Sequence, residues 1–175
     1  MLDRMHPFRM HQRSWTTLAV ALLRSAVAWP SEVRATAGGG GAIAVIVHPD
    51  NPLTRVSLAE LRAMLLRQKD RWPNGNPIRI LNWEANSATR VAFDQAVLRL
   101  SPERVAAYWV DRRIRGLGTP PRSISSAQLI EGVVARNADF ISYLPARELS
   151  PRVKVLIVAG FKPGDAHYPI QAPSD

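Results

Sequence analysis

The 175-residue sequence contains no cysteine, so it can form neither a disulfide framework nor a metal site built on thiolates. Acidic residues are few: 14 Asp and Glu stand against 23 Lys and Arg, which gives a formal charge of +9. The basic excess is spread along the chain, and no nucleic-acid recognition motif accompanies it. We therefore expect no nucleic-acid partner, and the positive charge is compatible with anionic ligands.

A long apolar run is also lacking. The N-terminal run Trp15–Leu23 is far shorter than the roughly 20 residues that a transmembrane helix needs. It follows an arginine-containing segment and precedes two small-x-small cleavage patterns at residues 26–28 and 35–37. This arrangement predicts an export signal with its linker in residues 1–37, a folded domain in 38–175, and a periplasmic or secreted protein with no stable membrane span after cleavage. An ordinary amphipathic or disordered N-terminus is the alternative.

The periodicity of the remaining chain alternates between strands and helices. Strand-length apolar runs lie at residues 42–47, 78–81, 139–144 and 153–158, and helix-type apolar stripes lie at 58–65, 93–100, 105–109 and 129–134. This order predicts the α/β class, as a single three-layer lobe with a mostly parallel or mixed sheet. Helix starts are indicated at Ser57, Ser101 and Ser125, because capping boxes or an N-terminal proline follow them.

A candidate binding site lies in the stretch 77–100, which reads as a strand, a polar loop and a helix. Asn86, Ser87 and Thr89 are small polar residues at the expected helix start. The first N–H groups of a helix lack intrahelical acceptors and carry partial positive charge, so they can hold an anion. The competing interpretation is that Asn86 or Ser87 only caps the helix. Arg90 could add positive charge to the site, or it could pair with Asp94 one helical turn later.

His48 is a second candidate ligand-binding residue. It follows the apolar run 42–47, which is typical of a buried and usually parallel strand, and Pro49 ends that strand. Open α/β sheets tend to place ligands at the carboxyl ends of such strands. The alternative is a histidine that belongs only to the turn, because no other His, Asp or Glu lies at metal-ligand spacing from it. We expect no metal site and no cofactor.

Several stretches, in order, resemble one family. IAVIVHPDNP, VSLAELRAMLLRQKDRWPNGNPIRILN, NSATRVAF, ADFISYLP and HYPI are similar to segments of the phosphate-type substrate-binding proteins of ABC transporters. The resemblance runs from about Ile43 to Ile170. It implies a type II periplasmic-binding-protein-like fold and a small anion, such as phosphate or another oxyanion, bound for ABC-type transport or sensing. An ABC permease or another extracytoplasmic protein is the implied partner.

The resemblance also indicates which residues would form the site and where the chain departs from the family. The family's Gly-Ser-Gly-Thr loop reads Asn86-Ser87-Ala88-Thr89 here, followed by Arg90. Side chains in place of both glycines limit how closely the backbone can approach a ligand. Trp83 and Ala85 stand where the family has arginine and aspartate. The chain has residues for about one of the family's two lobes, and it matches the second.

Two other function classes are open to this sequence besides an anion-binding module. The first is an extracytoplasmic interaction domain without a small ligand, which would use the face that a missing lobe would otherwise cover. The second is an enzyme, for which the sequence offers no nucleophile elbow, HExxH, P-loop or readable carboxylate pair. We therefore expect no catalytic residues and no enzymatic activity.

Overall fold

The computed structural model describes residues 41–172, so the export signal predicted in residues 1–37 lies outside the described part and stays a prediction. The elements, in chain order, are β1 (Ile43–Val47), β2 (Arg55–Val56), α1 (Leu58–Leu65), β3 (Arg79–Trp83), α2 (Ala88–Phe93), the π-helical turn η1 (Asp94–Leu98), α3 (Pro102–Ile114), β4 (Arg122–Ile124), α4 (Ala127–Val134), β5 (Phe140–Pro145), the 3-10 turn η2 (Ala146–Glu148), β6 (Lys154–Val155) and β7 (Ile157–Val158). These elements form three layers.

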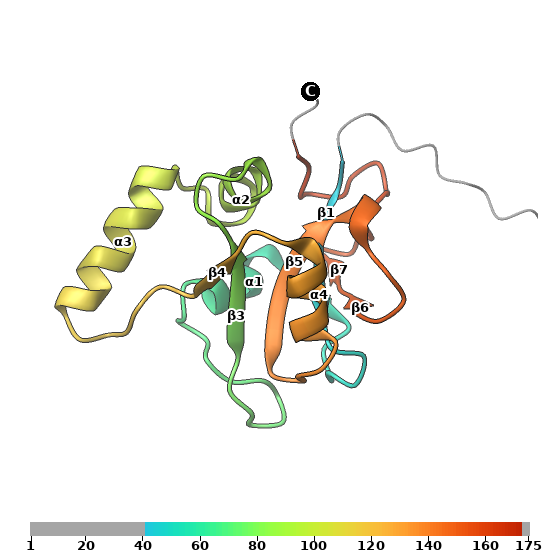
Figure 1. Ribbon diagram of the computed structural model, residues 1–175, viewed down its shortest axis with the longest axis horizontal. Helices are drawn as coiled ribbons and strands as arrows, with labels where there is room; N and C mark the ends of the chain where they lie inside the picture. The colour runs from blue at the N-terminus through green and yellow to red at the C-terminus, as the bar shows by residue number, and fades with distance from the viewer. Residues whose placement is uncertain (1–40, 173–175) are drawn as a thin grey trace, which may run out of the picture. The chain divides into compact units, whose positions relative to one another are not determined.

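The central layer is a five-stranded mixed sheet with the order β4-β3-β5-β1-β6. Strand β3 pairs in parallel with both β4 and β5, whereas β1 pairs antiparallel with both β5 and β6. Helix α4 covers one face of this sheet and α1 covers the other, while α3 extends along one side (Figure 1). The predicted α/β class and the mixed sheet are confirmed.

Strand β1 was expected to be parallel to its neighbours, and this expectation is wrong. All five of its residues are buried, as their unbroken apolar run predicted. Its partners nevertheless run in the opposite direction, with Ile43 opposite Pro145 and Val47 opposite Ile141. An apolar run reports that both faces of a strand are covered, and burial alone does not fix the direction of the neighbouring strands.

Serine side chains cap the three helices that the sequence indicated, one of them a residue later than expected. Ser57 Oγ accepts from Glu60 N at 3.1 Å at the start of α1. Ser101 Oγ accepts from Arg104 N at 3.4 Å at the start of α3, with Pro102 in the first turn. For α4 the cap is Ser126 rather than the predicted Ser125.

The remaining differences concern short or irregular elements. The predicted strand 153–158 is two strands, β6 and β7, which belong to different sheets. The helix predicted to reach Leu100 passes into the π-helical turn and ends at Arg99, whose φ of 54° is left-handed. Strand β4, which follows the loop at Pro120, was not predicted.

The core lies on both faces of β1 and β5. Leu61 and Met64 of α1 are fully buried, and so is Ile130 of α4. Phe93 of α2 stacks on Tyr143 of β5 with a ring-centroid distance of 3.5 Å and an interplanar angle of 5°. This contact fixes α2 above the end of β5. Within the described chain, no helix combines the length and the apolar character needed to cross a membrane.

Candidate functional site

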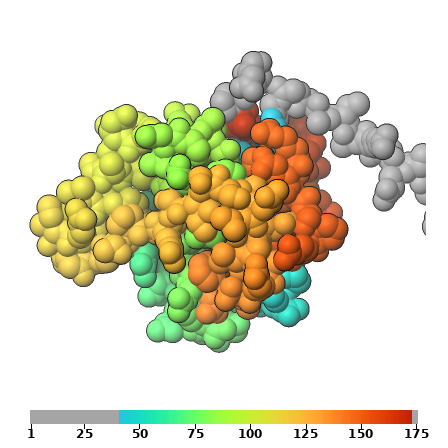
Figure 2. Space-filling model, viewed as in Figure 1, coloured from blue at the N-terminus to red at the C-terminus, as the bar shows by residue number. Residues whose placement is uncertain are grey.

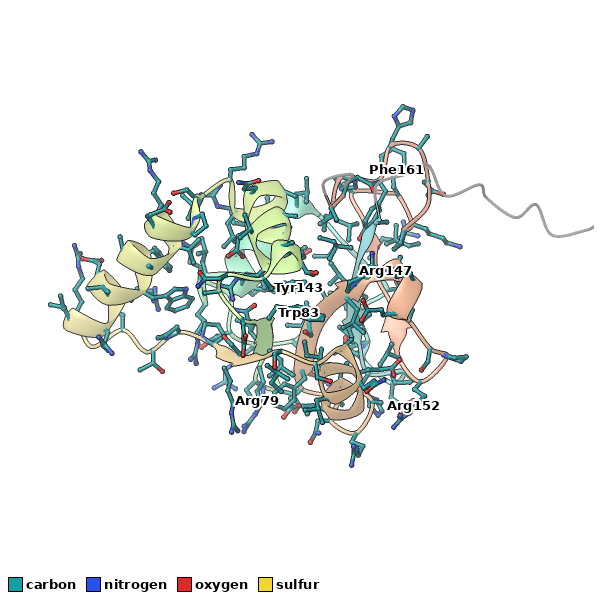
Figure 3. All side chains as sticks on the ribbon, turned by 45° about the horizontal axis from the view of Figure 1, so that its top comes forward. Arg79, Trp83, Tyr143, Arg147, Arg152 and Phe161 are labelled. Atoms are coloured by element: carbon teal, nitrogen blue, oxygen red, sulfur yellow. The ribbon has the colours of Figure 1, made fainter. Side chains whose placement is uncertain are left out.

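The loop between β3 and α2 lies at the carboxyl end of a parallel strand, where α/β sheets commonly bind ligands. The indole Nε1 of Trp83, the last residue of β3, donates to the carbonyl oxygen of Tyr143 at 2.8 Å. Figure 3 shows these two side chains close together beneath α2. The end of β3 is thereby tied to β5, and the loop starts from a rigid position.

Ser87 is the N-cap of α2, as the capping interpretation predicted for Asn86 or Ser87. Its backbone is extended, with φ −71° and ψ 141°, and its Oγ accepts from Arg90 N at 3.2 Å. The same hydroxyl donates to the carbonyl oxygen of Glu84 at 2.9 Å. The Ser87 hydroxyl therefore already has a donor and an acceptor within the loop, and it orders the turn.

The remaining loop residues face solvent and offer unused donors. Asn86 and Ala88 are exposed, and Thr89 is half-buried. The backbone N–H groups of Ala88 and Thr89 have no hydrogen-bond acceptor among residues 41–172, as expected for the first turn of a helix. Two backbone donors and the Thr89 hydroxyl are thus available, and the exposed carboxylate of Glu84 lies in the same turn.

Arg90 is buried and forms the ion pair that one of its two interpretations predicted. It is 7% exposed, and its Nε donates to Asp94 Oδ2 at 2.5 Å while its Nη1 donates to the Trp83 carbonyl at 3.2 Å. The predicted pairing with Asp94 is present, but it is enclosed rather than solvated. Burial raises the pKa of the Asp94 carboxyl, and the neighbouring guanidinium opposes that rise without cancelling it.

The structure does not bring His48 together with these residues. Because β1 is antiparallel to β5, its last residue Val47 pairs with Ile141 at the beginning of β5, whereas α2 follows the opposite end of the sheet. His48 Nδ1 accepts from Asp50 N at 3.1 Å, so the ring belongs to the turn after β1. Arg79 at the start of β3 also lies away from α2 (Figure 3).

Sequence reasoning missed a cavity next to the loop, between α3 and the β3–β4 edge of the sheet. Its volume is about 340 Å³, and Asn82, Arg90 and Trp109 are among its lining residues. Trp109 is buried, as predicted for a core residue, but one side of it borders this cavity. Asn82, which directly follows the apolar run 78–81, was the available signal, since a strand with covered faces seldom buries an amide.

Residues 41–172 contain no cluster of three or more His, Asp or Glu side chains placed to hold a metal ion. The chemistry available around the loop is therefore that of hydrogen-bond donors and one buried ion pair.

Comparisons by sequence gave no match: no protein-family model matches the chain, and no curated protein matches it. Solved structures do match. An ABC-type phosphate transport receptor from Vibrio cholerae aligns with a TM-score of 0.63 at 16% identity, covering 77% of this chain and 55% of the receptor. A putative phosphate ABC transporter substrate-binding protein with bound phosphate, from Clostridium perfringens, aligns with a TM-score of 0.63 at 22% identity, covering 77% and 54%.

PstS from Borrelia burgdorferi aligns similarly, with a TM-score of 0.61 at 14% identity, covering 77% of this chain and 55% of PstS. The chain thus spans about half the length of each of these proteins. At this level of identity the likeness concerns the fold. The chain has the type II periplasmic-binding-protein-like fold seen in phosphate substrate-binding proteins of ABC transporters.

Proposed function

We propose that the protein is an exported, one-lobe solute-binding-like domain that holds a small oxyanion, such as phosphate, at the start of α2. The observation that carries the proposal is the position of the Ser87–Thr89 segment, at the carboxyl end of a parallel strand in a fold shared with phosphate-binding proteins. The structural neighbours are binding proteins, which favours binding over catalysis.

The donors would be the N–H groups of Ala88 and Thr89 together with the Thr89 hydroxyl. All three belong to the first turn of α2, and the backbone pair has no acceptor among the described residues. Ser87 and Arg90 act indirectly: Ser87 holds the turn, and Arg90 is occupied by Asp94 and the Trp83 carbonyl. The anion thus meets the partial positive charge of the helix start rather than a guanidinium.

Three features of the chain make this site weak. Glu84 is exposed and precedes the donors in the same turn, so its negative charge disfavours an anion there. Side chains at Asn86 and Ala88 keep a ligand further from the backbone than glycines would. The donors also lie at the surface of the described part of the chain, so we expect a dissociation constant of about 1 mM at low salt.

The test is isothermal titration calorimetry of the folded protein with phosphate and sulfate at low ionic strength. Thr89→Val keeps the shape of the side chain and removes its hydroxyl, so it should weaken binding about fivefold, the loss expected for one hydrogen bond. Glu84→Gln should strengthen binding by removing the repelling charge. Ser126→Ala removes the equivalent cap of another helix, α4, and serves as the matched control with unchanged binding.

Absence of heat with either anion from a cooperatively folded sample would contradict the proposal. So would full binding by Thr89→Val together with no effect of Glu84→Gln, because the anion would then bind elsewhere.

A second candidate is an extracytoplasmic interaction domain without a small ligand. It is favoured by exposed apolar side chains on α3 and in the turn after it, namely Val110, Ile114 and Leu117, and by the match to only about half the length of the structural neighbours. An ABC permease or another extracytoplasmic protein would be the partner. Co-purification of a partner from the native host, lost on Ile114→Asp but kept on Arg115→Asp, would favour this candidate over the first.

Export itself can be measured separately. The sequence-based prediction is a mature protein that begins after Ala28 or Ala37, so N-terminal sequencing of protein recovered outside the cytoplasm should give one of these starts. Retention of the intact chain in the cytoplasm would contradict it.

A further inference from the structure

The cavity beside α3 has the size and the walls of a small-molecule site. Its volume of about 340 Å³ falls in the range of ligand pockets, and an apolar cavity of about 150 Å³ already accepts benzene. Val105, Ala106 and Trp109 line it from α3, and Pro120 and Pro121 line it from the segment before β4. Walls of this kind fit an apolar ring and do not suit a hydrated inorganic ion.

The base of the cavity is polar. Asn82 of β3 pairs with Ser123 of β4 in the parallel ladder, so both side chains lie on the same face of the sheet, and both residues line the cavity. Asn82 is only 5% exposed, and its side-chain amide is not one of the fully enclosed polar atoms that lack a partner among residues 41–172. Because Asn82 lines the cavity, its side-chain amide can hydrogen-bond a polar atom of a ligand held there.

The charge around the cavity is positive. Asp94 is the acidic residue of the lining, and its carboxylate is paired with Arg90. Arg113 of α3 is exposed, also lines the cavity, and forms no ion pair with any described residue. An unpaired guanidinium beside an apolar chamber favours a ligand that carries a carboxylate.

We propose that this cavity binds a small organic carboxylate with a single aromatic or similarly sized apolar ring. The ring packs between Trp109 and Pro121, the carboxylate meets Arg113, and a polar atom on the ring hydrogen-bonds the Asn82 amide. The site does not include the oxyanion donors at the start of α2, although the two sites adjoin at the loop that follows β3 and at Arg90.

Calorimetric titration of the full chain with phenylacetate, 4-hydroxyphenylacetate and the neutral analogue phenylacetamide tests the chemistry. Phenylacetate should bind about tenfold more tightly than phenylacetamide, the difference expected for one charge-assisted contact. The hydroxyl compound should bind tighter still in the parent protein, and Asn82→Ala should abolish that advantage.

Paired variants on α3 locate the site. Ala106→Phe places a ring inside the cavity and should abolish phenylacetate binding, whereas Ala107→Phe adds the same ring at an exposed position outside the lining and should leave it unchanged. Arg113→Gln should remove the preference for phenylacetate over phenylacetamide, whereas Arg104→Gln on the same helix should keep it. Thr89→Val should not affect phenylacetate, which distinguishes this site from the oxyanion site.

Three results would overturn the proposal. The first is no binding of any of the three probes to the folded protein. The second is equal binding of phenylacetate and phenylacetamide, because the anionic component would then be absent. The third is binding by Ala106→Phe as strong as in the parent protein, because the ligand would then occupy another place.

Discussion

Replacing Arg90 with methionine should strongly destabilise the fold, because it leaves a buried carboxylate without its partner. Arg90 and Asp94 are 7% and 5% exposed, and Nε and Oδ2 are 2.5 Å apart. Breaking such a pair from one side costs about 3 to 5 kcal/mol. The variant also removes the hydrogen bond from Arg90 Nη1 to the Trp83 carbonyl oxygen, which is 3.2 Å long. The loss of that bond accounts for about 1 kcal/mol of the total cost.

For a domain of this size the loss corresponds to a fall in Tm of about 10 to 15 °C. Urea unfolding at pH 7, followed by circular dichroism, measures the free energy directly. The double variant Arg90→Met with Asp94→Asn removes both charges and keeps the size of residue 94. It should recover all but about 1 to 2 kcal/mol of the loss, since the Trp83 carbonyl still lacks a donor.

The pH dependence of the single variant has a definite sign. Burial raises the pKa of Asp94 above its ordinary value of 3.8, and Arg90 opposes the rise, so removing Arg90 raises that pKa further. A carboxyl with a higher pKa in the folded state binds protons more readily when folded. The free energy of unfolding of Arg90→Met, measured relative to the double variant, should therefore increase as pH falls from 7 through the raised pKa towards 3.8.

Two observations would refute this reasoning: a loss below about 1 kcal/mol in Arg90→Met at pH 7, or a double variant no more stable than the single one. Either would mean that the carboxylate is hydrated or finds another partner in the folded state.

Two tyrosines should respond oppositely to the same substitution in urea unfolding. Tyr143→Phe should be neutral or stabilise by up to about 1 kcal/mol, because the buried Tyr143 hydroxyl has no partner among the described residues. Tyr168→Phe should destabilise by about 1 to 2 kcal/mol, because its hydroxyl donates to the Ile43 carbonyl at 2.9 Å; equal effects at both sites would contradict the hydrogen-bond assignment. Arg99→Gly should stabilise by about 0.5 kcal/mol, since a left-handed φ of 54° suits glycine; a clear loss of stability would show that the arginine side chain contributes more than the strain costs. Ser57→Ala should cost about 1 kcal/mol and Ser57→Asp should cost little, because either Ser or Asp caps α1; equal losses would assign the effect to something other than the cap.

Local signals predicted the parts of the fold that local chemistry determines. Ser57 and Ser101 cap their helices because an oxygen at that position satisfies a free N–H of the first turn. The same rule could not choose between Ser125 and Ser126, since both offer the required hydroxyl within a short run of serines. The burial of β1 was readable from its composition, whereas its direction depends on residues almost 100 positions away, at 141–145.

The candidate site could be predicted only in part, because some of its features depend on packing between elements that are distant in the sequence. The loop at Ser87 is visible in the sequence because capping residues and an apolar stripe adjoin each other. The enclosure of Arg90 depends on how α2 packs onto β5, and the cavity beside α3 depends on the three-residue strand β4, which has no periodicity of its own. His48 follows the carboxyl end of β1, as the sequence indicated, but the antiparallel direction of β1 puts that end of the strand opposite to the loop at Ser87.

Binding of phosphate at the start of α2 can be observed residue by residue in ¹H–¹⁵N spectra of the labelled protein titrated with phosphate at low salt. We expect saturable downfield shifts of the Ala88 and Thr89 amide protons, because these N–H groups would donate to the anion. The shifts should be much smaller in Thr89→Val, and the amide of Leu129 at the capped start of α4 should not move. Saturable binding that leaves Ala88 and Thr89 unshifted, or no shift anywhere in a folded sample, would contradict an oxyanion site on this loop.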